Sequence, residues 1–307
     1  ISVGNAHSCA VLEGGTIKCW GYDQCGELGD GTTTYLNGYR DPVDVKGISG
    51  ASNVSVSKTW FSGNGTPRQY AHTCAALAVG GVRCWGASPR GALGLPSESL
   101  SDWCLKYRRS SIPISVPWTN GGALTVAGQD HSCVLQADGR VQCWGGNQYG
   151  QLGDGSNRNS SAPVAVAGLE KAVGLTAGRF HNCAVTETGK IWCWGSNAAG
   201  QLGNSAAPAE HCGFWSGRQS CSTTPLAVTG LSNAELLSAG GYHTCALSNG
   251  RALCWGSNEW GQLGDGSQRN SETPVAVVGL EDVIGVSAGV YHTCVAPGRD
   301  GPLLGVQ

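Results

Sequence analysis

The chain contains no methionine, and only 13% of its 307 residues are charged. No initiating methionine or signal peptide is visible, so we interpret the sequence as a processed mature chain. No apolar run approaches the roughly 18 residues of a membrane-spanning helix, so we expect no membrane span. The formal net charge is −2 with both signs scattered. That pattern lacks the electrostatic footprint of a nucleic-acid-binding protein.

The chain also lacks the short motifs of common enzymes and metal sites. It has no Gly-x-Ser-x-Gly, no His-Glu-x-x-His, no phosphate loop and no Cys-x-x-Cys pair. We therefore predict no catalytic residues, no cofactor and no metal ligands. Carboxylates that distant loops bring together would leave no motif, so a secreted hydrolase remains an alternative.

What the chain does have is a motif that occurs six times. Each copy reads His-x-Cys, and five copies are followed by Cys-Trp-Gly about ten residues later. Successive histidines are 65, 59, 50, 62 and 49 residues apart. A period in this range is typical of solenoids, propellers and repeat arrays. The histidines are His7, His72, His131, His181, His243 and His292.

Each repeat predicts a small antiparallel sheet. In the clearest copy, residues 173–230, apolar residues alternate over 173–176, 183–185, 191–194 and 225–228, and Gly-rich turns separate these runs. Four short alternating runs predict a four-stranded blade, and nothing has the period of an amphipathic helix. We therefore predict an all-β fold, a single β-propeller domain over residues 1–307. Its blade number is six, alternatively seven, and its last blade is incomplete.

Loop insertions account for the unequal spacing and hold the residues that the blades do not need. They fall near 55–69, 95–112 and 204–223. We expect the last two on one propeller face and the first on the other. Trp, Tyr and Arg in exposed loops are the composition of interface hot spots. The alternative is that these aromatics seal their own loops. The predicted binding residues are Trp60, Phe61, Trp103, Lys106, Tyr107, Arg108, Arg109, Phe214, Trp215 and Arg218.

The repeat resembles that of the regulator of chromosome condensation family. The resemblance rests on Gly-x-x-His-x-Cys, then Cys-Trp-Gly-x-Asn-x-x-Gly-Gln-Leu-Gly-Asp-Gly, then Pro-Val-x-Val-x-Gly-Leu, and is sharpest over residues 144–155 and 255–266. It implies a β-propeller, normally with seven blades. It does not imply one function, because members include a nuclear nucleotide-exchange factor, a plant photoreceptor and a secreted bacterial β-lactamase inhibitor. With its many cysteines, the chain resembles a secreted, cysteine-rich member of bacterial type.

The cysteine spacing predicts one disulfide in each of five hairpins. The two cysteines of a repeat lie symmetrically about a turn, so they should face each other on neighbouring strands about 4.5–5.5 Å apart. The pairs are Cys9–Cys19, Cys74–Cys84, Cys133–Cys143, Cys183–Cys193 and Cys245–Cys254. A disulfide in every blade indicates an oxidising compartment, so we expect a secreted or cell-surface protein.

Five cysteines lie outside these hairpins. Cys212 and Cys221 are nine residues apart in one insertion and are expected to pair locally. Cys25 and Cys104 occupy equivalent loops of adjacent blades and could pair across them. Cys294 is left over because Gly305 stands at its partner's position. The incomplete last blade therefore offers a route to self-association, and fraying of a short terminus is the alternative.

Other repeated residues have structural interpretations that compete with functional ones. The histidines could line a metal site, but a residue repeated in every blade is expected to serve the blade, by bonding a neighbouring turn. Gly-Asp-Gly at 29–31, 153–155 and 264–266 could indicate calcium, but Asp-Gly is a common turn pair. Asn53, Asn64 and Asn159 begin N-glycosylation sequons.

The leading functional hypothesis is an extracellular, non-catalytic recognition propeller that binds a protein or glycan through its insertions. The secreted hydrolase is the second hypothesis. A guanine-nucleotide-exchange-type regulator is the third, and the cysteine content argues against it because that activity is nuclear.

Overall fold

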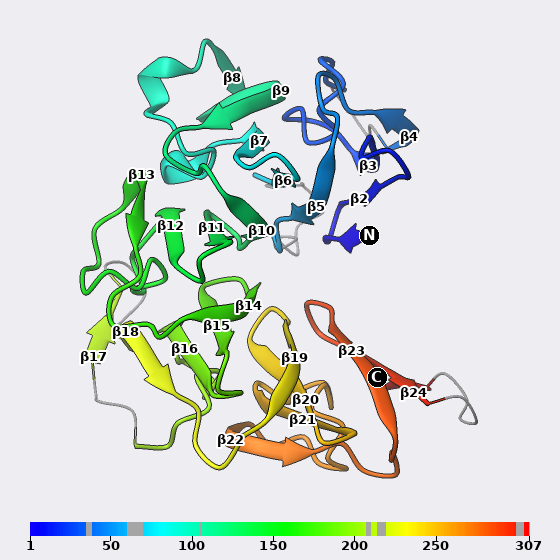
Figure 1. The fold of residues 1–307 in the computed structure, drawn as a ribbon, viewed down its shortest axis with the longest axis vertical. Coiled ribbons are helices and arrows are strands. Elements are labelled where there is room, and N and C mark those ends of the chain that lie inside the picture. Colours follow the sequence, from blue (N-terminus) through cyan, green and yellow to red (C-terminus); the bar gives the residue numbers. More distant parts are fainter. Residues whose placement is uncertain are drawn as a thin grey trace. The chain divides into compact units, whose positions relative to one another are not determined.

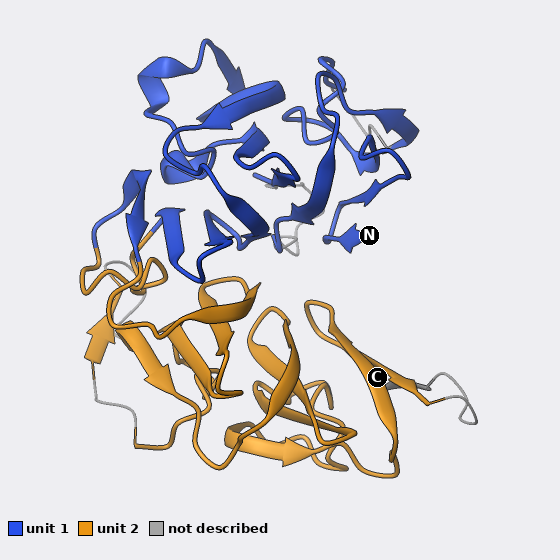
Figure 2. Ribbon diagram, viewed as in Figure 1, with its two compact units in different colours: residues 1–146, 158–165 blue, residues 147–157, 166–307 orange. Residues whose placement is uncertain are grey.

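Six antiparallel sheets account for almost all the regular structure of the computed structural model (Figure 1). The structure describes residues 1–34, 39–59, 70–104, 106–206, 210–213, 219–298 and 304–306. They fall into two units: unit 1 holds 1–146 and 158–165, and unit 2 holds 147–157 and 166–307 (Figure 2). Within the described ranges no helix is long and apolar enough to cross a membrane. The all-β prediction is confirmed, whereas the blade number and the single-domain arrangement stay predictions.

Unit 1 contains three sheets, listed here in the order in which their strands pair. Sheet 1 is β1 (Ser2–Val3), β2 (His7–Val11), β3 (Ile17–Tyr22) and β4 (Tyr39–Asp44). Sheet 2 is β5 (Ala51–Val56), β6 (His72–Leu77), β7 (Val82–Ala87), β9 (Tyr107–Val116) and β8 (Asp102–Cys104), with the 3₁₀ turns η1 (Pro89–Gly91) and η2 (Ser97–Ser99) between β7 and β8. Sheet 3 is β10 (Gly122–Ala127), β11 (His131–Gln136), β12 (Val141–Gly145) and β13 (Ser160–Ala165).

Unit 2 contains the other three sheets. Sheet 4 is β14 (Ala172–Ala177), β15 (His181–Thr186), β16 (Ile191–Ser196), β18 (Gln219–Ala227) and β17 (Glu210–Cys212). Sheet 5 is β19 (Ala234–Ala239), β20 (His243–Ser248), β21 (Arg251–Gly256) and β22 (Ser271–Ala276). Sheet 6 is β23 (Val283–Ala288), β24 (Thr293–Pro297) and β25 (Leu304–Val306), so its described part has three strands, as the sequence predicts for the last blade.

Two insertions form strands rather than the loops that the sequence predicts. The insertions near 95–112 and 204–223 fold back as hairpins, and β8 and β17 become fifth strands of sheets 2 and 4. The prediction of four strands per blade is therefore wrong for these two sheets. An added antiparallel strand satisfies backbone groups that the edge of a four-stranded sheet would leave unpaired.

Seven cysteine pairs lie at disulfide distance, in the combinations that the sequence predicts. The five hairpin pairs face each other directly across neighbouring strands, with Cα atoms 4.0–4.1 Å apart, closer than expected. The other two pairs are Cys25–Cys104 and Cys212–Cys221. Cys294 is free and exposed, opposite Gly305 in the strand register. The shorter turn of sheet 5 uses Asn249 and Gly250, both with positive φ, as a two-residue hairpin turn requires.

The loop after the third strand of a sheet contacts the following sheet through a single backbone carbonyl, and in each case that loop and the following sheet belong to one unit. Glu27 O accepts hydrogen bonds from Trp85 Nε1 at 2.8 Å and Thr73 Oγ1 at 3.1 Å. In three other loops the equivalent backbone carbonyl accepts hydrogen bonds from a buried Trp indole and from one polar side chain of the following sheet. The other sets are Ala92 with Trp144 and Ser132, Gln151 with Trp194 and Asn182, and Gln201 with Trp255 and Thr244.

The recurrence of the histidines reflects the same junction. His7 Nε2 lies 2.8 Å from Thr73 Oγ1, and His181 Nε2 lies 2.9 Å from Thr244 Oγ1. Because each hydroxyl gives its one proton to the carbonyl, the ring Nε2–H donates to the hydroxyl. Burial lowers the pKa of His7 to about 4, so the ring is neutral. The predicted partner, a neighbouring turn, is wrong: the partner is a hydroxyl of the next sheet, some 60 residues away.

We expect Thr244→Val to destabilise the protein by about 1–3 kcal/mol, because it leaves the buried His181 Nε2–H without its acceptor. Urea unfolding gives the free energy of unfolding of the variant and the wild type. Thr273→Val is the control: this residue lies on β22 of the same sheet and takes no part in the junction. Equal stability of Thr244→Val and wild type would contradict the role of the hydroxyl.

Candidate functional site

The β8–β9 hairpin of sheet 2 brings aromatic and cationic side chains to one place. In its register Trp103 faces Arg108 and Cys104 faces Tyr107. The Cys25–Cys104 pair ties the hairpin to the loop after β3 of sheet 1. A hairpin tied at one strand end holds its side chains in fixed positions, as a binding site needs.

Two cations of the hairpin, Arg108 and Lys106, lie against aromatic rings. The Arg108 guanidinium carbon is 4.0 Å from the ring centroid of Trp103, which is 56% exposed. Lys106 Nζ is 5.2 Å from the ring centroid of Tyr107 and 5.8 Å from that of Tyr70. The two tyrosine rings meet edge to face at 4.3 Å. These contacts orient the cations and keep them at the surface.

A groove of about 680 Å³ runs beside this hairpin. Its walls come from η1, η2, the hairpin and the segment that leads into β13, all in unit 1. Three cations line the groove, Arg90, Lys106 and Arg108, against one carboxylate, Glu98. Arg90 is paired with the carboxylate of Asp130, and Arg108 donates to Ser101 O at 3.0 Å. The groove therefore presents an excess of positive charge next to exposed aromatic surface.

The structure brings together four of the ten predicted binding residues. Trp103, Lys106, Tyr107 and Arg108 line the groove. Arg109 does not line it, and its Nε is buried without a hydrogen-bond partner. The other five predicted residues, Trp60, Phe61, Phe214, Trp215 and Arg218, lie outside the described residues.

Sequence reasoning missed several groove residues, among them Arg90, Glu98 and Asn159. Arg90 belongs to the repeat rather than to an insertion, at the position where other copies carry Cys25, Tyr149, Ala199 or Trp260. The variation at this position between copies of the repeat is the signal that could have found it. The sequence identifies Asn159 only as the start of a sequon, whereas the structure shows that it also lines the groove.

The loop beneath the hairpin carries two acids in place of amides. Asp23 and Glu27 stand where three of the corresponding loops have Asn and Gln, for example Asn197 and Gln201. The acids reproduce two of the amide contacts. Asp23 Oδ1 accepts from Leu28 N at 3.2 Å, and Glu27 Oε2 accepts from Cys25 N at 2.7 Å.

The acids do not reproduce a third contact, the hydrogen bond that the glutamine side-chain amide donates. Gln201 Nε2 donates to Ser196 Oγ at 3.3 Å, whereas Glu27 Oε1 is buried without a partner. Burial raises the pKa of Glu27 to about 8 and that of Asp23 to about 6. Glu27 is therefore largely protonated at neutral pH, and in that form it resembles the glutamine that it replaces.

We expect Glu27→Gln to stabilise the protein above about pH 8. A raised pKa in the folded state stabilises the protein fully below the unfolded value, near 4.5, and this stability is lost as the pH rises through about 8. The variant has no such loss, so its advantage should grow with pH to the order of 1–3 kcal/mol.

Urea unfolding near pH 5 and near pH 9 measures this difference. The exposed Glu13→Gln is the control and should change stability equally little at both pH values. A Glu27→Gln advantage that is the same at both pH values would rule out a raised pKa as its cause.

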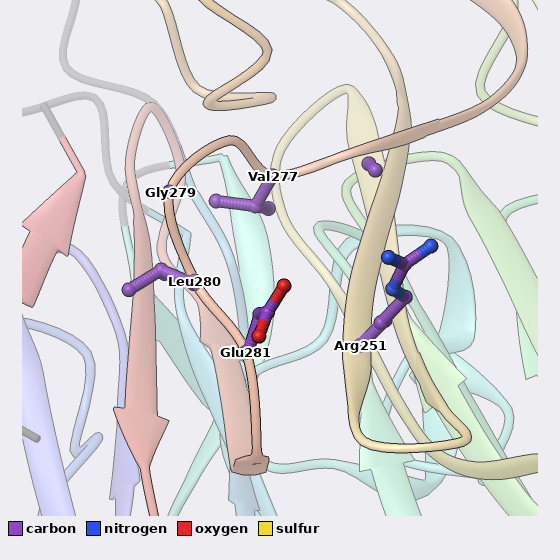
Figure 3. Close-up of a pocket in the computed structure, with 6 residues that line it drawn as sticks. Arg251, Val277, Gly279, Leu280 and Glu281 are labelled. Atoms are coloured by element: carbon purple, nitrogen blue, oxygen red, sulfur yellow. The ribbon is translucent and has the colours of Figure 1, made fainter.

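A second pocket, of about 510 Å³, lies in unit 2 between the β20–β21 turn and the segment between β22 and β23 (Figure 3). Arg251 and Glu281 come from opposite sides of it. Val277 and Leu280, which also line it, pack into the core between sheets 5 and 6. This pocket therefore offers few side chains that are not already used by the fold.

Within the described ranges, no group of three or more His, Cys, Asp or Glu side chains is placed to hold a metal ion. The Gly-Asp-Gly segments form turns, as the sequence predicts. Asp154 Oδ1 accepts from Ser156 N at 3.0 Å, and Asp265 Oδ1 accepts from Ser267 N at 2.9 Å.

Comparisons with known proteins agree with this architecture. A model of the RCC1-like domain family matches residues 1–295. Protein pim1 of Schizosaccharomyces pombe is 27% identical over 172 residues, which cover 51% of this chain and 29% of pim1. The matches span a third or less of the length of pim1 and of the two curated relatives that follow it.

Two solved structures have a similar fold over most of the chain. Prp20p of Saccharomyces cerevisiae superposes with a TM-score of 0.77 at 20% identity, covering 96% of this chain and 68% of Prp20p. Human WBSCR16 superposes with a TM-score of 0.76 at 20% identity, covering 96% and 71%. With the repeated sheets and the family match over nearly the whole sequence, the chain belongs to the RCC1-like domain family and has its β-propeller fold.

Proposed function

We propose that this chain is a non-catalytic recognition module whose groove beside the β8–β9 hairpin binds an acidic segment of a partner protein. The observation that carries the proposal is the stack of Arg108 on the exposed Trp103 ring, with Lys106 and Tyr107 beside it. Trp, Tyr and Arg are the residues that most often dominate binding energy at protein interfaces. With Arg90 paired to Asp130, Lys106 and Arg108 still outnumber the one carboxylate of the groove, Glu98, so the groove is complementary to negative charge.

Protein binding by similar propellers supports a binding role. Prp20p binds Gsp1p and histones, and a structure of yeast Prp20 holds Kap60. The partner of this chain need not be related to these, because the groove is built largely from an insertion in one sheet rather than from the shared repeat.

The cysteine pairs support a secreted or cell-surface location. Disulfides persist in oxidising compartments, and seven pairs in one domain-sized chain would be unusual in the cytosol. Mass spectrometry of peptides from the unreduced protein tests this part of the proposal, since free thiols at the hairpin cysteines would contradict it. Self-association through sheet 6 stays a prediction, which light scattering can test.

We expect Arg108→Glu to weaken binding of an octaglutamate peptide at least tenfold, because it removes a stacked cation and places a negative charge in the groove. Trp103→Ala should also weaken binding, since Arg108 loses the ring that orients it. Isothermal titration calorimetry in low salt measures both.

Arg251→Glu makes the same charge change at the pocket of unit 2 and is the control. An equal loss of affinity in Arg251→Glu would show that the peptide responds only to net charge, against the proposal. Failure of octaglutamate to bind at all, or binding of heparin alone, would likewise contradict a groove for acidic protein segments.

A further inference from the structure

The residue immediately before each repeat histidine differs between the two units. In unit 1 these residues are small or acidic: Ala6, Ala71 and Asp130. In unit 2 all three are aromatic: Phe180, Tyr242 and Tyr291. Because alanine serves at this position in two sheets, the sheet itself does not require an aromatic ring there. The aromatic residues of unit 2 therefore call for a role outside the sheets.

Backbone hydrogen bonds hold the loops that carry these aromatics side by side. Arg179 N donates to Gly241 O at 3.2 Å, and Gly241 N donates to Val290 O at 3.1 Å. Each of these residues directly precedes one of the aromatics. Phe180, Tyr242 and Tyr291 consequently occupy the same position on three adjacent loops.

Aromatic residues from two other loops adjoin these three. Tyr149 packs against Phe180 with ring centroids 5.0 Å apart. Tyr149 is the third residue of the loop Asn147–Gln151, and Trp260 is the third residue of the equivalent loop Asn258–Gln262.

The third residue of a loop also contacts the residue before the next histidine at sheet 2. There Arg90 is the third residue of its loop and bonds Asp130, the residue before His131. Gln262 O accepts from Thr293 of sheet 6, as Gln151 O accepts from Asn182 of sheet 4. From this equivalence we expect Trp260 on the side of its loop that faces Tyr291. We call Tyr149, Phe180, Tyr242, Trp260 and Tyr291 the aromatic row.

Arg179 fixes two rings of the row without charging its surface. Its guanidinium carbon is 5.3 Å from the Phe180 ring centroid and 5.0 Å from that of Tyr242, and its Nη1 donates to the Tyr242 hydroxyl at 2.7 Å. Arg179 is only 7% exposed, whereas Trp260 is 65% and Tyr291 is 38% exposed. The accessible part of the row thus consists of uncharged rings with hydroxyl and indole N–H donors at their edges.

We propose that the aromatic row binds an extended, proline-rich segment of a partner protein. A polyproline II helix has no internal hydrogen bonds, so its carbonyls are free to accept from the tyrosine hydroxyls and the indole. Its flat apolar rings pack on aromatic faces, and it loses little conformational entropy on binding. An uncharged row gives no advantage to an acidic or basic segment. The row and the cationic groove of unit 1 are therefore surfaces for chemically different ligands.

Decaproline is the probe, and Trp260→Ala and Tyr291→Ala are the test variants, because both residues are exposed enough to be removed without opening the core. We expect saturable binding by the wild type in isothermal titration calorimetry. In each variant we expect the dissociation constant to be at least tenfold larger, the usual loss of affinity at a hot-spot aromatic. Trp118→Ala is the matched control: it removes an equally exposed tryptophan (70%) from unit 1 and should leave binding unchanged.

Thermal unfolding tests whether the variants remain folded. If one of them unfolds early, the other still tests the proposal. The proposal is overturned if decaproline does not bind in a saturable way up to a few millimolar, or if Trp118→Ala weakens binding as much as Trp260→Ala. It is also overturned if cellotetraose binds with the same dependence on Trp260 and decaproline does not, which would make the row a glycan site.

Discussion

The structure depends on one buried carbonyl per loop that accepts from the next sheet. At Gln201 this oxygen receives the Trp255 indole N–H and the Thr244 hydroxyl, and the hydroxyl in turn accepts from His181. A buried carbonyl or indole left unpaired would cost about 1–3 kcal/mol of stability. Replacing any one of these groups alone therefore destabilises the folded protein. The recurrence of His, of Trp in five copies and of a polar residue, which is a hydroxyl except at Asn182, is the consequence of this constraint.

The same constraint shows where the chain is free to vary. Two positions adjoin the junction without taking part in it: the third residue of the loop and the residue before the histidine. In unit 1 they form the Arg90–Asp130 ion pair beside the groove, and in unit 2 the Tyr149–Phe180 contact of the aromatic row. The repeat thus supplies a rigid frame on which two variable positions, in contact at both of these junctions, can carry different chemistry.

Local patterns made much of the fold predictable. The hairpin strands and their cysteine pairs follow from spacings of nine or ten residues, because the two cysteines of a pair share one turn. The partner of each histidine did not follow, since it lies about 60 residues away in the next sheet. The strands β8 and β17 were also missed, because each has only three residues and no visible alternation. At the candidate site, the insertion pattern predicts Trp103, Lys106, Tyr107 and Arg108, which line the groove, whereas it does not predict Glu98 or Arg90.

The loop after β3 shows that acids can replace the amides of the repeat without changing the backbone contacts. Asp23 and Glu27 keep two of the backbone contacts of the amides that they replace, so the loop retains its conformation. They add titratable groups in a place where burial favours the neutral form. Cys25 lies between them and is paired with Cys104 of the β8–β9 hairpin. A change in the ionisation of Glu27 therefore acts on a loop that is covalently tied to the groove, and no other described loop of the repeat combines a buried acid with such a tie.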